Sequence, residues 1–160
     1  MNIFYLDTDS KKAASMHCDK HVVKMVLEST QILCTVFNKK GIIIPGSYSP
    51  THRNHPCVLW VEKSFGNFKW LLSLALHLST EYTLRYNKIH KCHSILCTIE
   101  NYFTNDFNPT MWKMKNFSKP PQCMPDKYKQ DNTVEAYRAY YKGEKAKFAK
   151  WAHSNKPEWW

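Results

Sequence analysis

A stretch near the N-terminus combines residue types suited to proton transfer and to anion binding. His17, His21, Lys24, Glu28 and Gln31 recur at steps of three or four residues, a spacing that places them on one face of a helix. Imidazole changes its charge near neutral pH and therefore suits proton transfer. The alternative interpretation is a solvated helix face, which the same lysine and glutamate would also produce.

A second group of reactive side chains lies in a short loop bounded by prolines. His52, Arg53 and His55 stand between Pro50 and Pro56, directly before a predicted helix. A helix N-terminus beside cationic side chains favours anions. The loop is therefore a candidate phosphate site, and a polar connecting loop is the alternative.

The C-terminal stretch 137–151 interleaves aromatic and basic residues. Aromatic rings stack on bases while lysine and arginine neutralise phosphate, so this pattern is typical of nucleic-acid binding. An amphipathic helix that uses some of its rings as core is the alternative, since Tyr137, Tyr141 and Phe148 share one face. The residues expected to contact a strand are Tyr140, Tyr141, Lys142 and Lys145, joined by Lys20 beside the first histidines.

Bulk properties narrow the class of protein. The formal net charge of +10 over 160 residues favours a polyanionic partner, DNA or a nucleotide. The absence of a long apolar run argues against a membrane span, and the first residues do not resemble a secretory signal, so a cytoplasmic location is expected, in a host cell if the protein is viral.

Metal binding has little support in the sequence pattern. His17 and His21 have the spacing of two zinc ligands on a helix, but neither HExxH nor CxxC occurs among the histidines and the six cysteines. No metal and no cofactor are therefore expected.

The periodicity of apolar residues predicts an all-α fold. One helix is expected over 10–38, a loop over 39–54, a long helix over about 56–86 and a short one within 88–104. A proline-containing loop is expected over 105–130, and a last helix begins near Asp131 and carries aromatic residues to Trp151. These elements predict a single compact domain, 1–160, of about three to five helices.

The layout resembles the pyrimidine-dimer DNA glycosylase/AP lyase family, small all-α repair enzymes of the phage endonuclease V type. Three stretches carry the resemblance: the N-terminal arm 1–3 before a helix, the 49–51 and 55–58 stretches before a long helix, and the aromatic-basic run 140–145. The resemblance implies that the nucleophile is the N-terminal α-amine, here that of Met1, because the bulky Asn2 should leave the initiator methionine in place. It also implies a glutamate on the first helix facing that amine. At the corresponding place this sequence has His21, with Glu28 two turns further on, and Asn2 replaces an arginine of the family.

The leading hypothesis is therefore a base-excision enzyme that acts on damaged or modified DNA. Met1 would be the nucleophile and His21 the general acid/base, with Glu28 as a further catalytic candidate. Three alternatives remain: a protein that binds or cleaves a nucleotide, a nucleic-acid-binding module without chemistry, and a metal-dependent hydrolase. The residues expected to bind phosphate are His17, Lys24, His52, Arg53 and His55.

Overall fold

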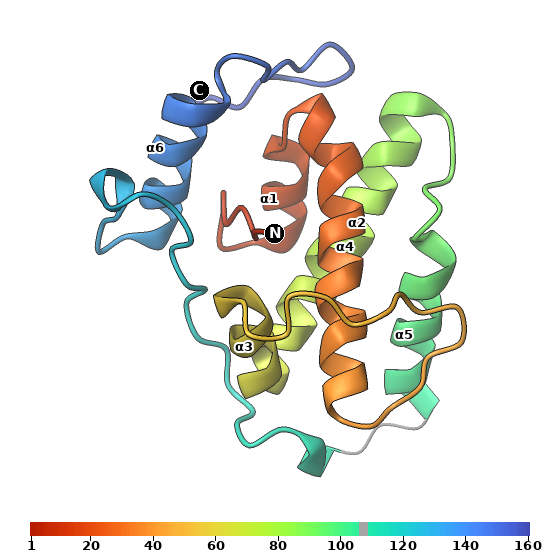
Figure 1. Cartoon of the computed structure of the whole chain (residues 1–160). Helices are drawn as coiled ribbons and strands as arrows, with labels where there is room; N and C mark the ends of the chain where they lie inside the picture. Colours follow the sequence, from red (N-terminus) through yellow and green to blue (C-terminus); the bar gives the residue numbers. More distant parts are fainter. Residues whose placement is uncertain (106–108) are drawn as a thin grey trace.

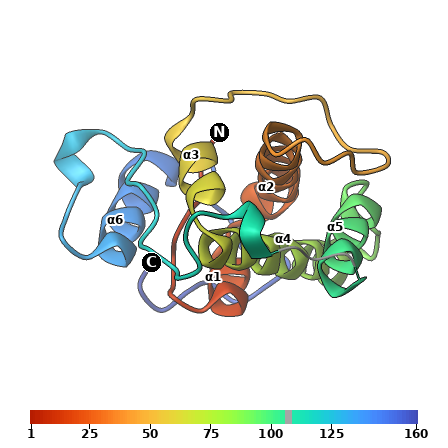
Figure 2. The ribbon, with the colours of Figure 1, turned by 90° about the horizontal axis from the view of Figure 1, so that it is seen from below.

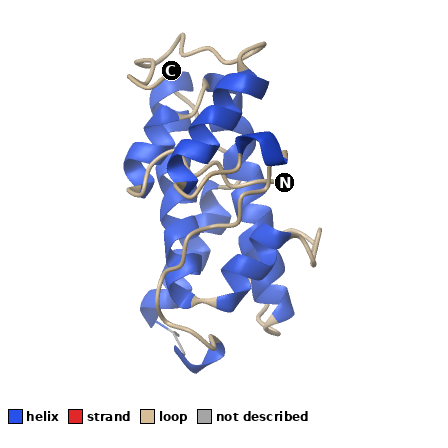
Figure 3. Ribbon diagram, turned by 90° about the vertical axis from the view of Figure 1, so that its left-hand side faces the viewer, coloured by secondary structure: helices blue, strands red, loops and turns tan. Residues whose placement is uncertain are grey.

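The computed structural model describes residues 1–105 and 109–160, and within them it is built from helices and loops without a β-strand (Figures 1 and 3). The α-helices are α1 (Ser10–Met16), α2 (Asp19–Lys39), α3 (Pro56–Lys63), α4 (Phe65–Tyr86), α5 (His93–Asn105) and α6 (Thr133–Lys145), with 3-10 turns at Pro109–Met111 and Asp126–Tyr128. The predicted all-α class is confirmed. The helix count exceeds the expected three to five because two predicted helices are each interrupted.

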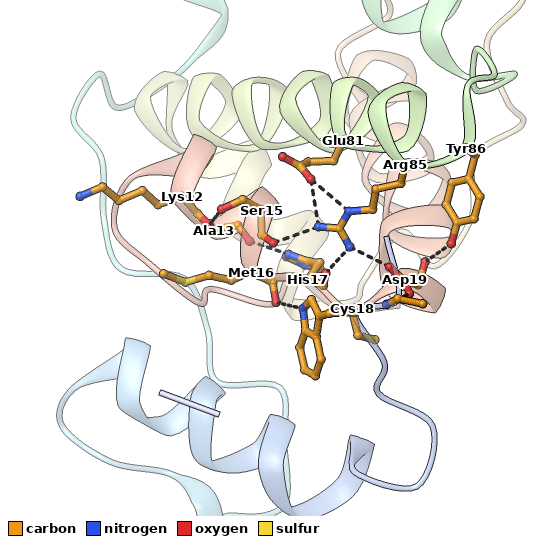
Figure 4. Close-up of polar contacts among 12 residues, drawn as sticks. Lys12, Ala13, Ser15, Met16, His17, Cys18, Asp19, Glu81, Arg85 and Tyr86 are labelled. Carbon is orange, nitrogen blue, oxygen red and sulfur yellow. Dashed lines mark hydrogen bonds and ion pairs between the residues drawn. The ribbon is translucent and has the colours of Figure 1, made fainter. Parts of the chain in front are cut away.

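The first interruption separates α1 from α2 at two residues with extended backbone. His17 has ψ 137° and Cys18 has ψ 162°, so the helix expected over 10–38 is broken there. The guanidinium of Arg85 stabilises the break: it donates to the carbonyl oxygens of Ser15 and His17, at 2.9 and 2.8 Å (Figure 4). Carbonyls at a helix C-terminus lack partners within the helix, and a cation there is favourable.

The same guanidinium is held by two carboxylates. Arg85 pairs with Asp19 at 3.2 Å and with Glu81, one turn back on α4, at 2.9 Å. Its side chain is almost fully buried, so these acidic partners offset the cost of removing the charge from water. Arg85 thus fixes the corner between α1 and α2 against α4, and this corner sets the direction in which α2 runs.

The second interruption falls at Ser64, between α3 and α4. Ser64 adopts an extended conformation, and its Oγ accepts the backbone N–H of Gly66 as the N-cap of α4. Backbone N–H groups at this helix start also donate to carbonyls of the 114–115 segment, since Phe65 bonds Met114 and Gly66 bonds Lys115. The helix predicted over 56–86 is therefore two helices, because a distant loop satisfies the exposed donors at the break.

One hydrophobic cluster includes buried residues from all six α-helices. Helix α2 packs against α3 and α4, α1 packs against α4, and α5 flanks α4 on the side away from α6 (Figures 1 and 2). The N-terminal arm is non-helical and enters this core, with Ile3 and Leu6 fully buried. It lies between α6 and the α1–α2 pair (Figure 1).

The last helix departs from the prediction at its end. Helix α5 lies close to the predicted 88–104, whereas α6 ends at Lys145, so the last helix does not continue to Trp151. The following tail crosses to the α1–α2 corner instead: the carbonyl of Lys150 accepts the backbone N–H of Asp19, and Trp151 donates to the carbonyl of Met16. The described part of the proline-containing loop is pinned by Trp112, which is buried. Among the described residues, no helix combines the length and apolarity needed to cross a membrane.

Candidate active site

The N-terminal amine and a carboxylate of α2 lie side by side inside the protein. Met1 N is 3.9 Å from Glu28 Oε2, and the backbone N–H of Asn2 donates to the same oxygen at 3.0 Å. The side chains are sheltered, 3% exposed for Met1 and 13% for Glu28. The expectation that His21 occupies the place facing the amine is therefore wrong: the facing group is Glu28. A carboxylate in this position can accept a proton from the amine and stabilise positive charge near it.

The side chain of Asn2 fixes the arm in this position. Its Nδ2 donates to the carbonyl oxygen of Cys123 at 2.9 Å. Its Oδ1 lies 3.1 Å from the Tyr137 hydroxyl, which shares its proton between this oxygen and the Pro121 carbonyl oxygen at 2.6 Å. The arm is therefore tied to α2, to the loop around Cys123 and to α6 at once. Spacing in the sequence could not indicate these roles for Asn2, Cys123 and Tyr137, because the contacts of Asn2 with the other two residues join positions more than a hundred apart.

The amine and Glu28 border a cavity of about 410 Å³. Lysines and aromatic rings dominate its wall: Lys145 Nζ lies 4.6 Å from the ring centre of Tyr140, and Lys20 Nζ lies 5.3 Å from that of Phe148. Lys24 reaches Glu28 Oε1 at 3.3 Å. The lining residues are Met1, Asn2, Phe4, Lys20, His21, Lys24, Met25, Glu28, Cys123, Tyr140, Lys145 and Phe148. Positive charge beside flat apolar rings suits a nucleotide.

His21 lines the cavity, but its ring packs against the rings of Phe4 and Tyr141 inside the protein. Its ring stacks on Phe4, with ring centres 4.5 Å apart, and only 5% of the residue is exposed. The Tyr141 hydroxyl accepts the backbone N–H of Cys18 at 3.0 Å and forms a second hydrogen bond with His21 Nδ1 at 2.7 Å.

Burial lowers the pKa of His21 to about 3, and the positive charges of neighbouring groups add to the shift. The imidazole is consequently neutral at physiological pH. The stacking on Phe4 and the hydrogen bond with Tyr141 favour a positioning role for His21 over the predicted role of general acid/base.

Two residues expected to contact nucleic acid are buried. His17 is fully buried, since the break after α1 turns it inward, where its Nδ1–H donates to the Ala13 carbonyl at 2.7 Å. Burial lowers the pKa of His17 to about 4. Tyr141 is also fully buried, and its pKa is raised by the same desolvation. Neither side chain is available to a DNA strand in this structure, which corrects both predictions.

No residue of the histidine–arginine loop (His52, Arg53 and His55) lines the cavity. Arg53 bonds the Asn38 side chain in the last turn of α2, and His52 is exposed with φ 49°. His55 is the N-cap of α3, where its Nδ1 accepts the Cys57 backbone N–H. Lys142 is exposed and faces Trp159, with Nζ 5.9 Å from a ring centre. The cavity lining thus brings together Met1, Lys20, His21, Lys24, Glu28, Tyr140 and Lys145. His55 lies next to this lining, beside Cys123, whereas His52, Arg53 and Lys142 are not part of it.

A family model described as pyrimidine dimer DNA glycosylase matches residues 1–94, more than half of the chain. The chain belongs to the pyrimidine dimer DNA glycosylase family. The matched part contains Met1, His21 and Glu28, whereas Cys123, Tyr140 and Lys145 lie beyond it. Membership gives a DNA glycosylase function at the level of the family, with DNA as the partner. No curated protein and no solved structure matches this chain.

Proposed function

We propose that this glycosylase uses the α-amine of Met1 as its nucleophile and Glu28 as its catalytic carboxylate, on a damaged or modified nucleotide in DNA. The observation that carries the proposal is the 3.9 Å approach of Met1 N to Glu28 Oε2 at the edge of a cavity. A nucleophile close to its base, with a pocket beside both, is the arrangement that covalent catalysis needs.

The chemistry follows from these two groups. The neutral amine attacks C1′ of the target sugar, a C1′–N bond forms, and the bond from C1′ to the base nitrogen breaks with its electron pair leaving on the base. Glu28 stabilises the positive charge that develops at C1′ and takes up the proton released by the amine. The released base takes a proton from solvent. The C1′–O4′ bond then breaks, O4′ takes the proton held by Glu28, and a Schiff base forms between Met1 and C1′. In the β-elimination that follows, C2′ loses a proton and the 3′-phosphate leaves with the electron pair of the C3′–O bond, which cleaves the strand.

Binding of the substrate is assigned to the cavity wall. Lys20, Lys24 and Lys145 neutralise the phosphates that flank the target. The rings of Phe4, Tyr140 and Phe148 provide faces on which an unstacked base can lie. A nucleotide reaches the amine only after it leaves the duplex stack, and a cavity of about 410 Å³ lies in the usual range for small ligands.

Borohydride reduction on a duplex containing one abasic site tests the proposal. A Schiff base is reduced to a stable cross-link, and mass spectrometry of the digested adduct should place it on the Met1 α-nitrogen. Intact-mass measurement first establishes that the purified protein carries a free Met1 amine. The control is a protein with two extra residues before Met1, which should bind DNA and fail to cross-link.

Two results would contradict the proposal. Absence of the cross-link with DNA binding intact would indicate a nucleic-acid-binding module without this chemistry. A cross-link on a lysine side chain of the cavity would show that the protein forms the covalent intermediate through another amine.

A further inference from the structure

Three soft metal-ligating side chains converge beside the candidate active site. His55, Cys57 and Cys123 each offer one ligand atom, and these atoms lie within 4.8 Å of one another. The two sulfur atoms are 3.6 Å apart. No other such group of three or more histidine, cysteine or acidic side chains occurs among residues 1–105 and 109–160.

The fold assembles the cluster from two distant parts of the chain. His55 and Cys57 occupy the N-cap and the first turn of α3, and Cys57 is fully buried. Cys123 comes from the loop before α6, where its backbone N–H donates to the Tyr137 hydroxyl and its carbonyl accepts from Asn2. Both segments are therefore held in place by contacts other than the thiol pair itself.

The dimensions fit a zinc ion. Tetrahedral zinc with Zn–S bonds of about 2.3 Å places two thiolate sulfurs about 3.8 Å apart, and the observed separation is 3.6 Å. Two thiolates and one imidazole are also the donor set that favours zinc over magnesium or calcium. We propose that His55, Cys57 and Cys123 bind one Zn²⁺ ion, with a fourth coordination position open to a non-protein ligand.

Binding requires small changes at the ligands. The two thiols release their protons to solvent as the Zn–S bonds form. His55 Nδ1 accepts the Cys57 backbone N–H. An ion bound to Nδ1 occupies the accepting lone pair, and an ion bound to Nε2 leaves the ring proton on Nδ1. In both cases this hydrogen bond is lost. The exchange replaces one helix-cap hydrogen bond with three coordination bonds.

The position of the cluster gives the ion a structural consequence. Cys123 lines the same cavity as Met1 and Glu28, and Asn2 is hydrogen-bonded to the Cys123 carbonyl. A zinc ion would therefore tie the start of α3 to the loop that holds the N-terminal arm. It would fix one wall of the cavity without taking part in the reaction.

Cobalt titration tests the proposal independently of DNA chemistry. The full chain is stripped with a chelator, kept reduced with a phosphine, and titrated with Co²⁺. One equivalent should produce a thiolate-to-cobalt charge-transfer band and the intense visible bands of a tetrahedral site, and Zn²⁺ should remove both. Cys123→Ser and His55→Asn should each weaken binding at least about 100-fold, since even loss of an outer-shell partner costs about 10- to 100-fold.

Matched variants keep the test decisive. Cys97→Ser and His153→Asn change the same residue types away from the cluster and should leave the titration unchanged. Cys97 contacts His93 on α5, so its variant also tests a second cysteine–histidine pair. Circular dichroism establishes that each variant is folded, and Cys123, being only partly buried, is preferred to Cys57 for substitution. Absence of the charge-transfer band in the reduced wild type, or a band that survives Cys123→Ser, would overturn the proposal. Either result would leave the Met1 cross-linking experiment unaffected.

Discussion

Glu28 Oε2 accepts the backbone N–H of Asn2 at 3.0 Å and lies 3.9 Å from the amine of Met1. One carboxylate oxygen thus both holds the N-terminal arm and faces its first nitrogen. The same atom therefore serves both the catalytic role proposed for Glu28 and the positioning of the arm. A substitution that tests catalysis must remove the charge and keep the hydrogen bond to Asn2.

Glu28→Gln keeps the size of the side chain and an oxygen that can accept the Asn2 N–H, but removes the negative charge. We expect base release and strand cleavage to fall by about 100-fold or more, the range for loss of a positioned acid/base group, while DNA affinity changes little. Single-turnover cleavage of a lesion-containing duplex and a binding titration measure the two quantities. Glu62→Gln, a carboxylate paired with Lys39 on another part of the molecule, is the control and should cleave at the wild-type rate.

His21→Asn tests whether the histidine transfers protons or supports Phe4. The asparagine side chain can still form a hydrogen bond with the Tyr141 hydroxyl, and an imidazole whose pKa is about 3 does not titrate between about pH 5 and about pH 8. We expect less than about a tenfold loss of cleavage rate and a pH profile parallel to that of the wild type. Loss of a positioned acid/base group would instead lower the rate by about 100-fold or more. Loss of one limb of the profile in this variant would instead establish His21 as the general acid/base.

The spacing of α2 residues predicted much of the cavity. Lys24 and Glu28 lie one turn apart on the face that meets the N-terminal arm, as the steps of three and four residues required. Helical periodicity is a local property, so it can be inferred without knowing the rest of the fold. The same rule failed for His17, because the break before α2 depends on Arg85, which lies 68 positions away.

Other parts of the site depend on tertiary contacts that leave no local pattern. Cys123 follows two prolines in an irregular loop, and only its hydrogen bonds to Asn2 and Tyr137 bring it to the cavity. Tyr140 and Tyr141 are adjacent and chemically alike, yet one lines the cavity and the other is fully buried. The aromatic-basic pattern of α6 identified the helix correctly but could not assign its faces without the core.

The salt dependence of DNA binding distinguishes the cavity lysines from the other basic residues. Each phosphate contact contributes a slope of about −0.9 in a plot of log K against log salt. We expect Lys20→Gln, Lys24→Gln and Lys145→Gln each to reduce the steepness of the slope by up to about that amount. Lys91→Gln, an exposed lysine outside the cavity wall, should leave the slope unchanged.

The histidine–arginine loop can be tested in the same assay. Arg53 is exposed but bonded to Asn38 and absent from the cavity wall. We expect Arg53→Gln to preserve the salt slope. A reduction of the slope comparable to that of Lys24→Gln would show that the DNA path extends from the cavity along α2 to this loop.

Arg85→Met should destabilise the protein strongly without touching the cavity. The variant leaves Asp19 and Glu81 without their buried cation, and the carbonyls at the end of α1 without their donor. Removing one partner of a buried ion pair costs about 3–5 kcal/mol, and the partial exposure of the carboxylates places the expected loss near about 3 kcal/mol. Urea unfolding measures this loss in the free energy of unfolding.

Arg53→Met is the control, and its free energy of unfolding should stay within about 0.5 kcal/mol of the wild-type value. An equally small loss for Arg85→Met would mean that the α1–α2 corner does not depend on this guanidinium.

The buried His17 predicts that stability falls on mild acidification. Burial lowers its pKa to about 4 from the ordinary value of 6.5, so between these values the unfolded chain binds more protons than the folded protein. The free energy of unfolding therefore decreases as the pH falls from about 6.5 toward 4, by up to about 3 kcal/mol from this residue.

His17→Asn retains an N–H that can reach the Ala13 carbonyl but does not titrate, so its unfolding free energy should decline less steeply over this interval. His153→Asn, a change at an exposed histidine, should keep the wild-type slope. Equal slopes for His17→Asn and the wild type would show that His17 can become protonated without leaving the folded state.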